Sequence, residues 1–175
     1  MDESSKVLEK NEKVIYNSKP EYLPYIITSL LGTLVLTLLI VLIFIFMIPS
    51  FYLAVSFGIL VFLLGVIISN MAYNRTHYTI TNKRILVQSG IIGRDFKSID
   101  YDRIQNVSVN VGILGVIFKT GTIDIFTGEL ETTGSGEHGT SVQSKYTKLS
   151  NITQPYYILK ILQEHLSKRK EKLIR

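Results

Sequence analysis

Residues 22–74 read YLPYIITSLLGTLVLTLLIVLIFIFMIPSFYLAVSFGILVFLLGVIISNMAYN, and no Asp, Glu, Lys or Arg interrupts these 53 positions. A helix rises about 1.5 Å per residue, so about 20 apolar residues cross the roughly 30 Å hydrocarbon core of a bilayer. The run is long enough for two crossings, and Pro49-Ser50 near its middle is a turn signal. We therefore expect a hairpin of two transmembrane helices, at residues 26–48 and 51–72.

The hairpin divides the chain of 175 residues into four parts. We expect an N-terminal segment at residues 1–21, the hairpin at 22–74, one folded domain at 75–167 and a basic tail at 168–175. The residues after the hairpin, about 100, are enough for one domain and not for two. The apolar run begins too far into the chain, and is too long, for a cleaved signal peptide.

The charges that flank the hairpin predict its orientation. Because the turn between the helices is so short, both soluble ends must lie on the same side of the membrane. Lysines precede the first helix and basic residues follow the second, whereas the turn carries no charge. This distribution predicts a multi-pass protein of the cell membrane with both termini in the cytoplasm. Three Asn-X-Ser/Thr triplets, at Asn74, Asn106 and Asn151, point the other way because they are formal glycosylation sites.

Small side chains gather on one face of each expected helix. They are Ser29, Gly32, Thr33 and Thr37 on the first helix, and Ala54, Gly58, Gly65 and Ser69 on the second. In lipid, small residues let helix backbones approach closely, which favours packing within the hairpin or between copies in an oligomer. A transport path typically needs a charge inside the membrane, and the run has none.

The region after the hairpin changes to short alternating segments, which are typical of β-strands. We expect strands at residues 77–81, 84–89, 96–101, 103–110, 121–127 and 140–149, and a solvent-exposed glycine-rich loop at 128–139. A final helix follows, with Thr153 as its cap, Pro155 in its first turn and an apolar face up to Leu166. This order predicts a small α+β domain, or a barrel closed by a helix.

Several of these stretches resemble the bacterial pleckstrin-homology-like domain of membrane-flanked proteins, the type-2 bacterial PH family. They are YTITNKRIL at 78–86, GII at 90–92, RIQNVSV at 103–109, GILG at 112–115 and GTIDI at 121–125, with NEKVIY at 11–16 before the hairpin. The resemblance implies a bent barrel of about seven strands, closed at one end by the C-terminal helix. The loop at 128–139 and the basic tail depart from the family pattern.

Basic residues near a membrane suggest contact with anionic lipid. Residues 75–175 contain fifteen Lys and Arg against nine Asp and Glu, a difference of +6. The turn at 81–84 is much shorter than the basic loop that grips inositol phosphates in eukaryotic relatives, so we favour a solvated turn for Lys83 and Arg84. The candidate lipid-contacting residues are Arg75, Lys83, Arg84, Lys168, Arg169, Lys170, Lys172 and Arg175.

Candidate catalytic groups are scattered. His77, His138 and His165 lie far apart, the chain has no cysteine, and no phosphate-binding glycine motif is present. Asp100 and Asp102 are more simply partners of nearby basic residues than a carboxylate pair for catalysis. We therefore expect no enzyme activity, cofactor, metal, small-molecule substrate or nucleic acid.

The sequence is most consistent with a non-enzymatic integral membrane protein that presents a cytoplasmic PH-like domain as a protein-interaction or assembly module. Its expected partners are membrane lipids and either further copies of itself or another membrane protein. Two alternatives stay open: sensing of anionic lipid by the domain and its basic tail, and a role as accessory subunit of a larger membrane complex.

Overall fold

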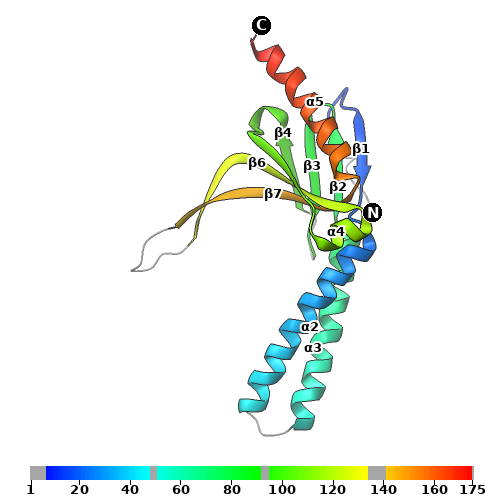
Figure 1. Ribbon diagram of the computed structural model, residues 1–175, viewed down its shortest axis with the longest axis vertical. Coiled ribbons are helices and arrows are strands. Elements are labelled where there is room, and N and C mark those ends of the chain that lie inside the picture. The colour runs from blue at the N-terminus through cyan, green and yellow to red at the C-terminus, as the bar shows by residue number, and fades with distance from the viewer. Residues whose placement is uncertain (1–6, 48–50, 92–94, 134–140, 175) are drawn as a thin grey trace.

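A computed structural model describes residues 7–47, 51–91, 95–133 and 141–174. Two long helices, α2 (Tyr22–Met47) and α3 (Phe51–Arg75), run side by side from one end of a sheet-rich domain (Figure 1). Both are long and apolar enough to cross a membrane, and only 6% and 11% of their most apolar windows are buried. The core helices of soluble proteins are mostly buried, so these two helices are not of that kind.

The contact between α2 and α3 uses the small residues of both helices. Ser29 and Ser69 are hydrogen bonded through their hydroxyl groups. A β-carbon added to Gly58 would collide with Val41, and one added to Gly65 would collide with Thr33. Ala54 and Gly58 are buried. Gly32 is different, because a β-carbon there would meet nothing within 4 Å.

The first sheet joins the N-terminal segment to the chain after the hairpin. Its strands are β1 (Val14–Ser18), β2 (His77–Thr81), β3 (Arg84–Ser89) and β4 (Asp95–Asp100), all antiparallel and in that spatial order. The turn from β2 to β3 lies where the sequence predicted it. The expected N-terminal segment at 1–21 therefore contains a strand of the domain.

The second sheet has the order β5-β6-β7, from β5 (Asn106–Asn110), β6 (Thr120–Thr133) and β7 (Ser141–Thr153). A short 3-10 helix, η1 (Tyr101–Arg103), leads from the first sheet to the second, and α4 (Ile113–Phe118) connects β5 to β6. Among the described residues the two sheets share no strand pair, so the single closed barrel is not confirmed. The chain turns at η1 instead of extending the first sheet past β4.

The core lies between the two sheets and α5 (Pro155–Ile174). Ile80, Ile85 and Ile99 come from the first sheet, Ile123, Ile125 and Leu149 from the second, and Ile158 and Leu162 from the helix; all are at most 2% exposed. β2 and β3 give alternate residues to this core, and the residues between them are buried as well, so these two central strands are covered on both faces. α5 thus covers the space between the sheets.

Several expected boundaries differ from the structure: for example, β5 begins at Asn106 and not at residue 103, and β7 ends at Thr153 and not at residue 149. Residues 128–133, which we expected in a loop, extend β6, and residues 134–140 lie outside the described part of the chain. Gly128, at φ +82°, lies at an irregularity in the β6–β7 register, which lets the ladder continue beyond it.

The C-terminal segment differs as well. The carbonyl of Gln154, not the side chain of Thr153, marks the start of α5, because it accepts the first helical bonds from Tyr157 and Ile158. The expected basic tail continues α5 to Ile174. Lys and Arg are good helix formers, and the pair Glu164–Lys168 supports this helix across one turn.

Replacing Gly65 by Leu should destabilise the hairpin, because the new side chain collides with Thr33. Overpacking typically costs about 1–3 kcal/mol. Gly32→Leu is the matched control, since this position has open space. Unfolding of both variants in mixed micelles, titrated with SDS, measures the difference. An equal effect of the two substitutions would contradict the packing described for α2 and α3.

Candidate functional site

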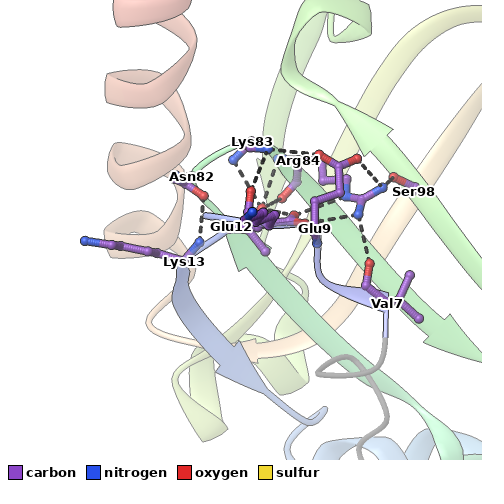
Figure 2. Close-up of polar contacts among 10 residues, drawn as sticks. Val7, Glu9, Glu12, Lys13, Asn82, Lys83, Arg84 and Ser98 are labelled. Carbon is purple, nitrogen blue, oxygen red and sulfur yellow. Dashed lines mark hydrogen bonds and ion pairs between the residues drawn. The ribbon is translucent and has the colours of Figure 1, made fainter.

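Among the described residues of the domain, a connected polar cluster surrounds the carboxylate of Glu12, just before β1 (Figure 2). Arg84 Nε donates to Glu12 Oε1 at 3.1 Å, and Arg84 Nη2 donates to Glu12 Oε2 at 3.0 Å. This fork is the strong, bidentate form of a carboxylate–arginine pair. The backbone amide of Glu9 and the hydroxyl of Thr81 add two further bonds, each 2.7 Å long. The Glu12 side chain is 0% exposed and that of Arg84 is 15% exposed.

The turn between β2 and β3 binds the N-terminal segment that contains Glu12 and Lys13. Thr81 Oγ1 accepts bonds from the backbone amides of Lys83 and Arg84, which closes the turn. Asn82 and Lys13 form two hydrogen bonds. The backbone amide of Lys13 donates to the side-chain oxygen of Asn82 at 2.8 Å, and the backbone amide of Asn82 donates to the Lys13 carbonyl at 3.0 Å. Side chains of this kind commonly stabilise turns by bonding to nearby backbone.

A second layer of contacts lies outside the fork. Lys83 Nζ is 2.9 Å from Glu9 Oε2, and Arg84 Nη1 is 3.6 Å from Glu9 Oε1. Arg84 also donates to the Val7 carbonyl at 3.0 Å and to Ser98 on β4 at 3.4 Å. One guanidinium therefore connects the N-terminal segment with two strands that follow the hairpin. We call Glu9, Glu12, Thr81, Lys83 and Arg84 the N-terminal clasp.

The clasp controls the protonation of Glu12. Burial alone would raise the pKa of this carboxyl, but the bonds from Arg84, from the Glu9 amide and from Thr81 outweigh burial and lower the pKa to about 2. The same pair raises the pKa of Arg84. Both groups are therefore charged at neutral pH. Their bonding capacity is largely used within the chain, so the clasp is suited to holding strands together.

The clasp lies at the end of the domain that is remote from the hairpin. β2 begins at His77, directly after α3, and runs five residues to Thr81. At about 3.3 Å per residue, the turn at 81–84 is therefore roughly 13 Å from the start of the strand. Lipid contact by Lys83 and Arg84 stays a prediction, and their position and ion pairs do not favour it.

The other candidate lipid-contacting residues are divided between two places. Arg75 ends α3, next to the domain. Lys168 is 2.7 Å from Glu164 on α5, and the C-terminal end of this helix points away from the hairpin (Figure 1). Arg169, Lys170 and Lys172 belong to the same helical segment, while Arg175 lies outside the described residues.

Aromatic residues form a collar where the hairpin meets the domain. The ring of Tyr73 lies 5.0 Å from that of Tyr22 and 5.4 Å from that of Tyr25, measured between centroids. Tyrosine is enriched where transmembrane helices pass the lipid headgroups. The collar was not predicted, although the three tyrosines stand at the two ends of the charge-free run.

The connection between the hairpin and the domain is short and hydrogen bonded. Only Thr76 separates α3 from β2. At the start of α2, the Glu21 amide donates to the Asn151 carbonyl of β7 at 2.7 Å. Tyr78 connects the sheets by accepting a bond from the Ser150 amide at 3.1 Å, and burial raises the pKa of Tyr78 to about 12. Both sheets are therefore connected to the domain end of the hairpin.

Of the three histidines, His138 lies outside the described residues and His165 lies on α5. His165 stacks on Tyr101 with centroids 5.8 Å apart and ring planes 16° apart. Within the described ranges, no group of three His, Cys, Asp or Glu side chains gathers as a metal site would require.

Comparison with known proteins adds the family. The family model described as Bacterial PH domain matches residues 23–170. The chain belongs to this family. The match spans the hairpin and the PH-like domain together, and it begins after Glu12 and β1. One similar solved structure is a DUF1696 family protein with a pleckstrin-homology domain from Shewanella loihica PV-4. It is 19% identical, covers 54% of this chain and 73% of its own, and gives a TM-score of 0.34. The comparison with curated proteins gives no match.

The N-terminal clasp predicts a pH-dependent stability of the PH-like domain. The folded-state pKa of Glu12 is lowered from 4.5 to about 2, so its contribution is present above pH 4.5 and is lost as the pH falls toward 2. Replacing Glu12 by Gln should remove on the order of 3 kcal/mol at neutral pH and much less below pH 2. Denaturant unfolding of the full chain in detergent, repeated across this range, measures the difference.

The control for this titration is Glu9→Gln. The Glu9 side chain is 55% exposed, and exposed ion pairs contribute less than about 1 kcal/mol. A loss of stability for Glu12→Gln that stayed constant from pH 7 to pH 2 would contradict the role assigned to the carboxylate.

Proposed function

We propose that the hairpin of this bacterial PH domain protein crosses the membrane and holds the PH-like domain at the cytoplasmic surface. The uncovered apolar side chains of α2 and α3 support a lipid environment. The tyrosine collar at the domain end of the hairpin supports the position of the boundary. Basic residues at this end, among them Lys19 and Arg75, favour the cytoplasmic side.

The absence of cysteine in the sequence allows a direct test of this topology. Single cysteines at Lys10, Tyr52 and Ser167 should be labelled differently by a membrane-impermeant maleimide. In intact cells we expect labelling of Tyr52→Cys alone, with Lys10→Cys and Ser167→Cys labelled only after permeabilisation. The reverse pattern would place the domain outside the cell, and labelling of all three positions would exclude a membrane-crossing hairpin.

We further propose that the PH-like domain is a non-enzymatic interaction module that binds a protein partner in the same membrane. This proposal is carried by the β6–β7 arm, which we define as residues 127–133 of β6 and 141–146 of β7. The arm extends away from the core (Figure 1). β5 pairs with β6 only from Thr122 to Phe126. Within the described residues, the arm therefore has two strands and an open edge on each side.

The side chains of the arm fit a binding role. Leu130 is 63% exposed and Tyr146 is 45% exposed, and the Tyr146 ring lies 5.3 Å from that of Phe126. A two-stranded ribbon alone is marginally stable in water, whereas an open edge with apolar side chains can accept a further strand. A partner strand along the arm would satisfy its free backbone groups and cover Leu130.

The membrane anchor makes weak contacts sufficient. Two proteins confined to one membrane meet at a high effective concentration, so a modest interface can be occupied. Lipid sensing has less support, because Lys83 and Arg84 are engaged in the clasp and the basic end of α5 points away from the hairpin. The partner can be a second copy of the chain or another membrane protein, and the test below separates the two.

A photo-crosslinking residue in place of Leu130 should capture the partner in native membranes. We expect one discrete adduct, because the arm presents this position at its open surface. The matched control is Gln163, an exposed residue on α5, which should give no such adduct. An adduct of twice the monomer mass indicates self-association, and any other discrete mass indicates a different partner. The same diffuse products from both positions, or none, would contradict the arm as the contact site.

A further inference from the structure

The short helix α4 exposes an apolar face. Ile113, Val116 and Ile117 are 83%, 71% and 65% exposed, and at 100° per residue they share one side of the helix. Leu114 and Phe118 lie on the opposite side and are half-buried. Aliphatic side chains that are this exposed and contiguous typically mark a contact surface.

α4 is held firmly in this orientation. A β-carbon added to Gly115 would meet the carbonyl oxygen of Thr120, which is backbone and has no room to move. At its C-terminal end, Lys119 adopts a left-handed conformation with φ 54°, and its amide bonds back to the Gly115 carbonyl. The helix therefore cannot turn its apolar face toward the domain without breaking the connection to β6.

The location of α4 indicates what covers this face. α4 contacts α2, and a groove between them is lined by Thr28 together with Gly112, Ile113 and Leu114. Thr28 lies six residues beyond Tyr22, so the groove is about 9 Å into the charge-free run along the helix axis. In Figure 1, α4 is at the junction of the sheets and the hairpin.

We propose that the Ile113, Val116 and Ile117 face of α4 is embedded in the same membrane leaflet that the hairpin enters. This inference rests on the proposed transmembrane hairpin. On α2, Leu31 lies about one helical turn beyond Thr28, on an adjoining side of the helix, and is 56% exposed, so α2 presents apolar surface beside the groove. Lys119 follows directly and is exposed, so its long side chain can extend toward the lipid headgroups.

A third membrane contact has a mechanical consequence. Two antiparallel helices leave the domain free to tilt about the line that joins them, whereas a third point of contact fixes a plane. β6 begins at Thr120, two residues after α4 ends, so α4 lies next to the start of the strand that continues into the β6–β7 arm. The arm would then extend along the membrane surface, where a partner in the same membrane can reach it.

Spin labels on the full chain in lipid nanodiscs test this proposal. The labels are attached to Val116→Cys on α4, to Leu39→Cys on the exposed side of α2, and to Ser167→Cys on the exposed end of α5. Accessibility to oxygen, which concentrates in lipid, is compared with accessibility to a water-soluble nickel complex. We expect position 116 to resemble position 39, with high oxygen and low nickel accessibility, and position 167 to show the reverse.

Three results would overturn the proposal, and each has a distinct meaning. Nickel accessibility at position 116 equal to that at 167, with position 39 in lipid, would leave the hairpin in the membrane and α4 in water. Shielding of position 116 from both reagents would place α4 against protein, as between two copies. Nickel accessibility at position 39 would remove the transmembrane hairpin itself, and the proposal for α4 with it.

Discussion

The pairing of β1 with β2 brings together two parts of the chain that the whole apolar hairpin separates. Val14 lies opposite Thr81 and Ser18 opposite Tyr78, so the hairpin leaves the domain from one strand and returns into the neighbouring strand. Paired strands are about 4.8 Å apart, which starts α2 and α3 close to each other. Packed helices usually lie about 8–10 Å apart, and small contact residues favour the lower part of this range. Further along the hairpin, Gly58 and Gly65 let α3 approach α2 closely, because an added β-carbon at either position would collide with α2.

The N-terminal clasp fixes the register of this pairing. β1 contains an irregularity between Val14 and Tyr16, and a short irregular edge strand specifies its register weakly. The Arg84 guanidinium donates two hydrogen bonds to the Glu12 carboxylate, and this geometry requires the observed alignment of the two segments. A register slip of one residue would therefore separate Glu12 from Arg84. A buried ion pair is often not a net source of stability, because both charges lose water, but removal of one partner leaves the other charge unpaired. The clasp thus discriminates between registers even where its net stabilisation is modest.

The sequence predicted the parts of the molecule that local patterns determine. The charge-free run located the two helices, the alternation around Asn82 located the β2–β3 turn, and the family resemblance agrees with the family that the comparison shows. The clasp was missed because an ion pair between Glu12 and Arg84 depends on strand pairing across the hairpin, which no local pattern encodes. The motif NEKVIY at 11–16 was the available signal, since a segment that resembles the family before the hairpin is expected to have a place in its domain.

The separation into two sheets and the exposed face of α4 also could not be predicted, because both depend on contacts between distant parts of the chain. GILGVIF is apolar in every direction, so its composition cannot show which side faces the domain. The contact of Gly115 with the Thr120 carbonyl decides that side, and it exists only when β6 is in place. Likewise, the extension of β6 past Gly128 depends on a partner strand that begins at Ser141. Tertiary contacts determine these features.

The central claim is that residues on both sides of the hairpin form one folding unit, held at its far end by Glu12 and Arg84. A double-mutant cycle with Glu12→Gln and Arg84→Gln in the full chain tests it most directly, with unfolding of the domain in detergent as the measurement. We predict a coupling free energy of about 0.5–3 kcal/mol, the range for residues in direct contact. Additive effects of the two substitutions would mean that Glu12 and Arg84 do not interact in the folded protein, and would contradict this account.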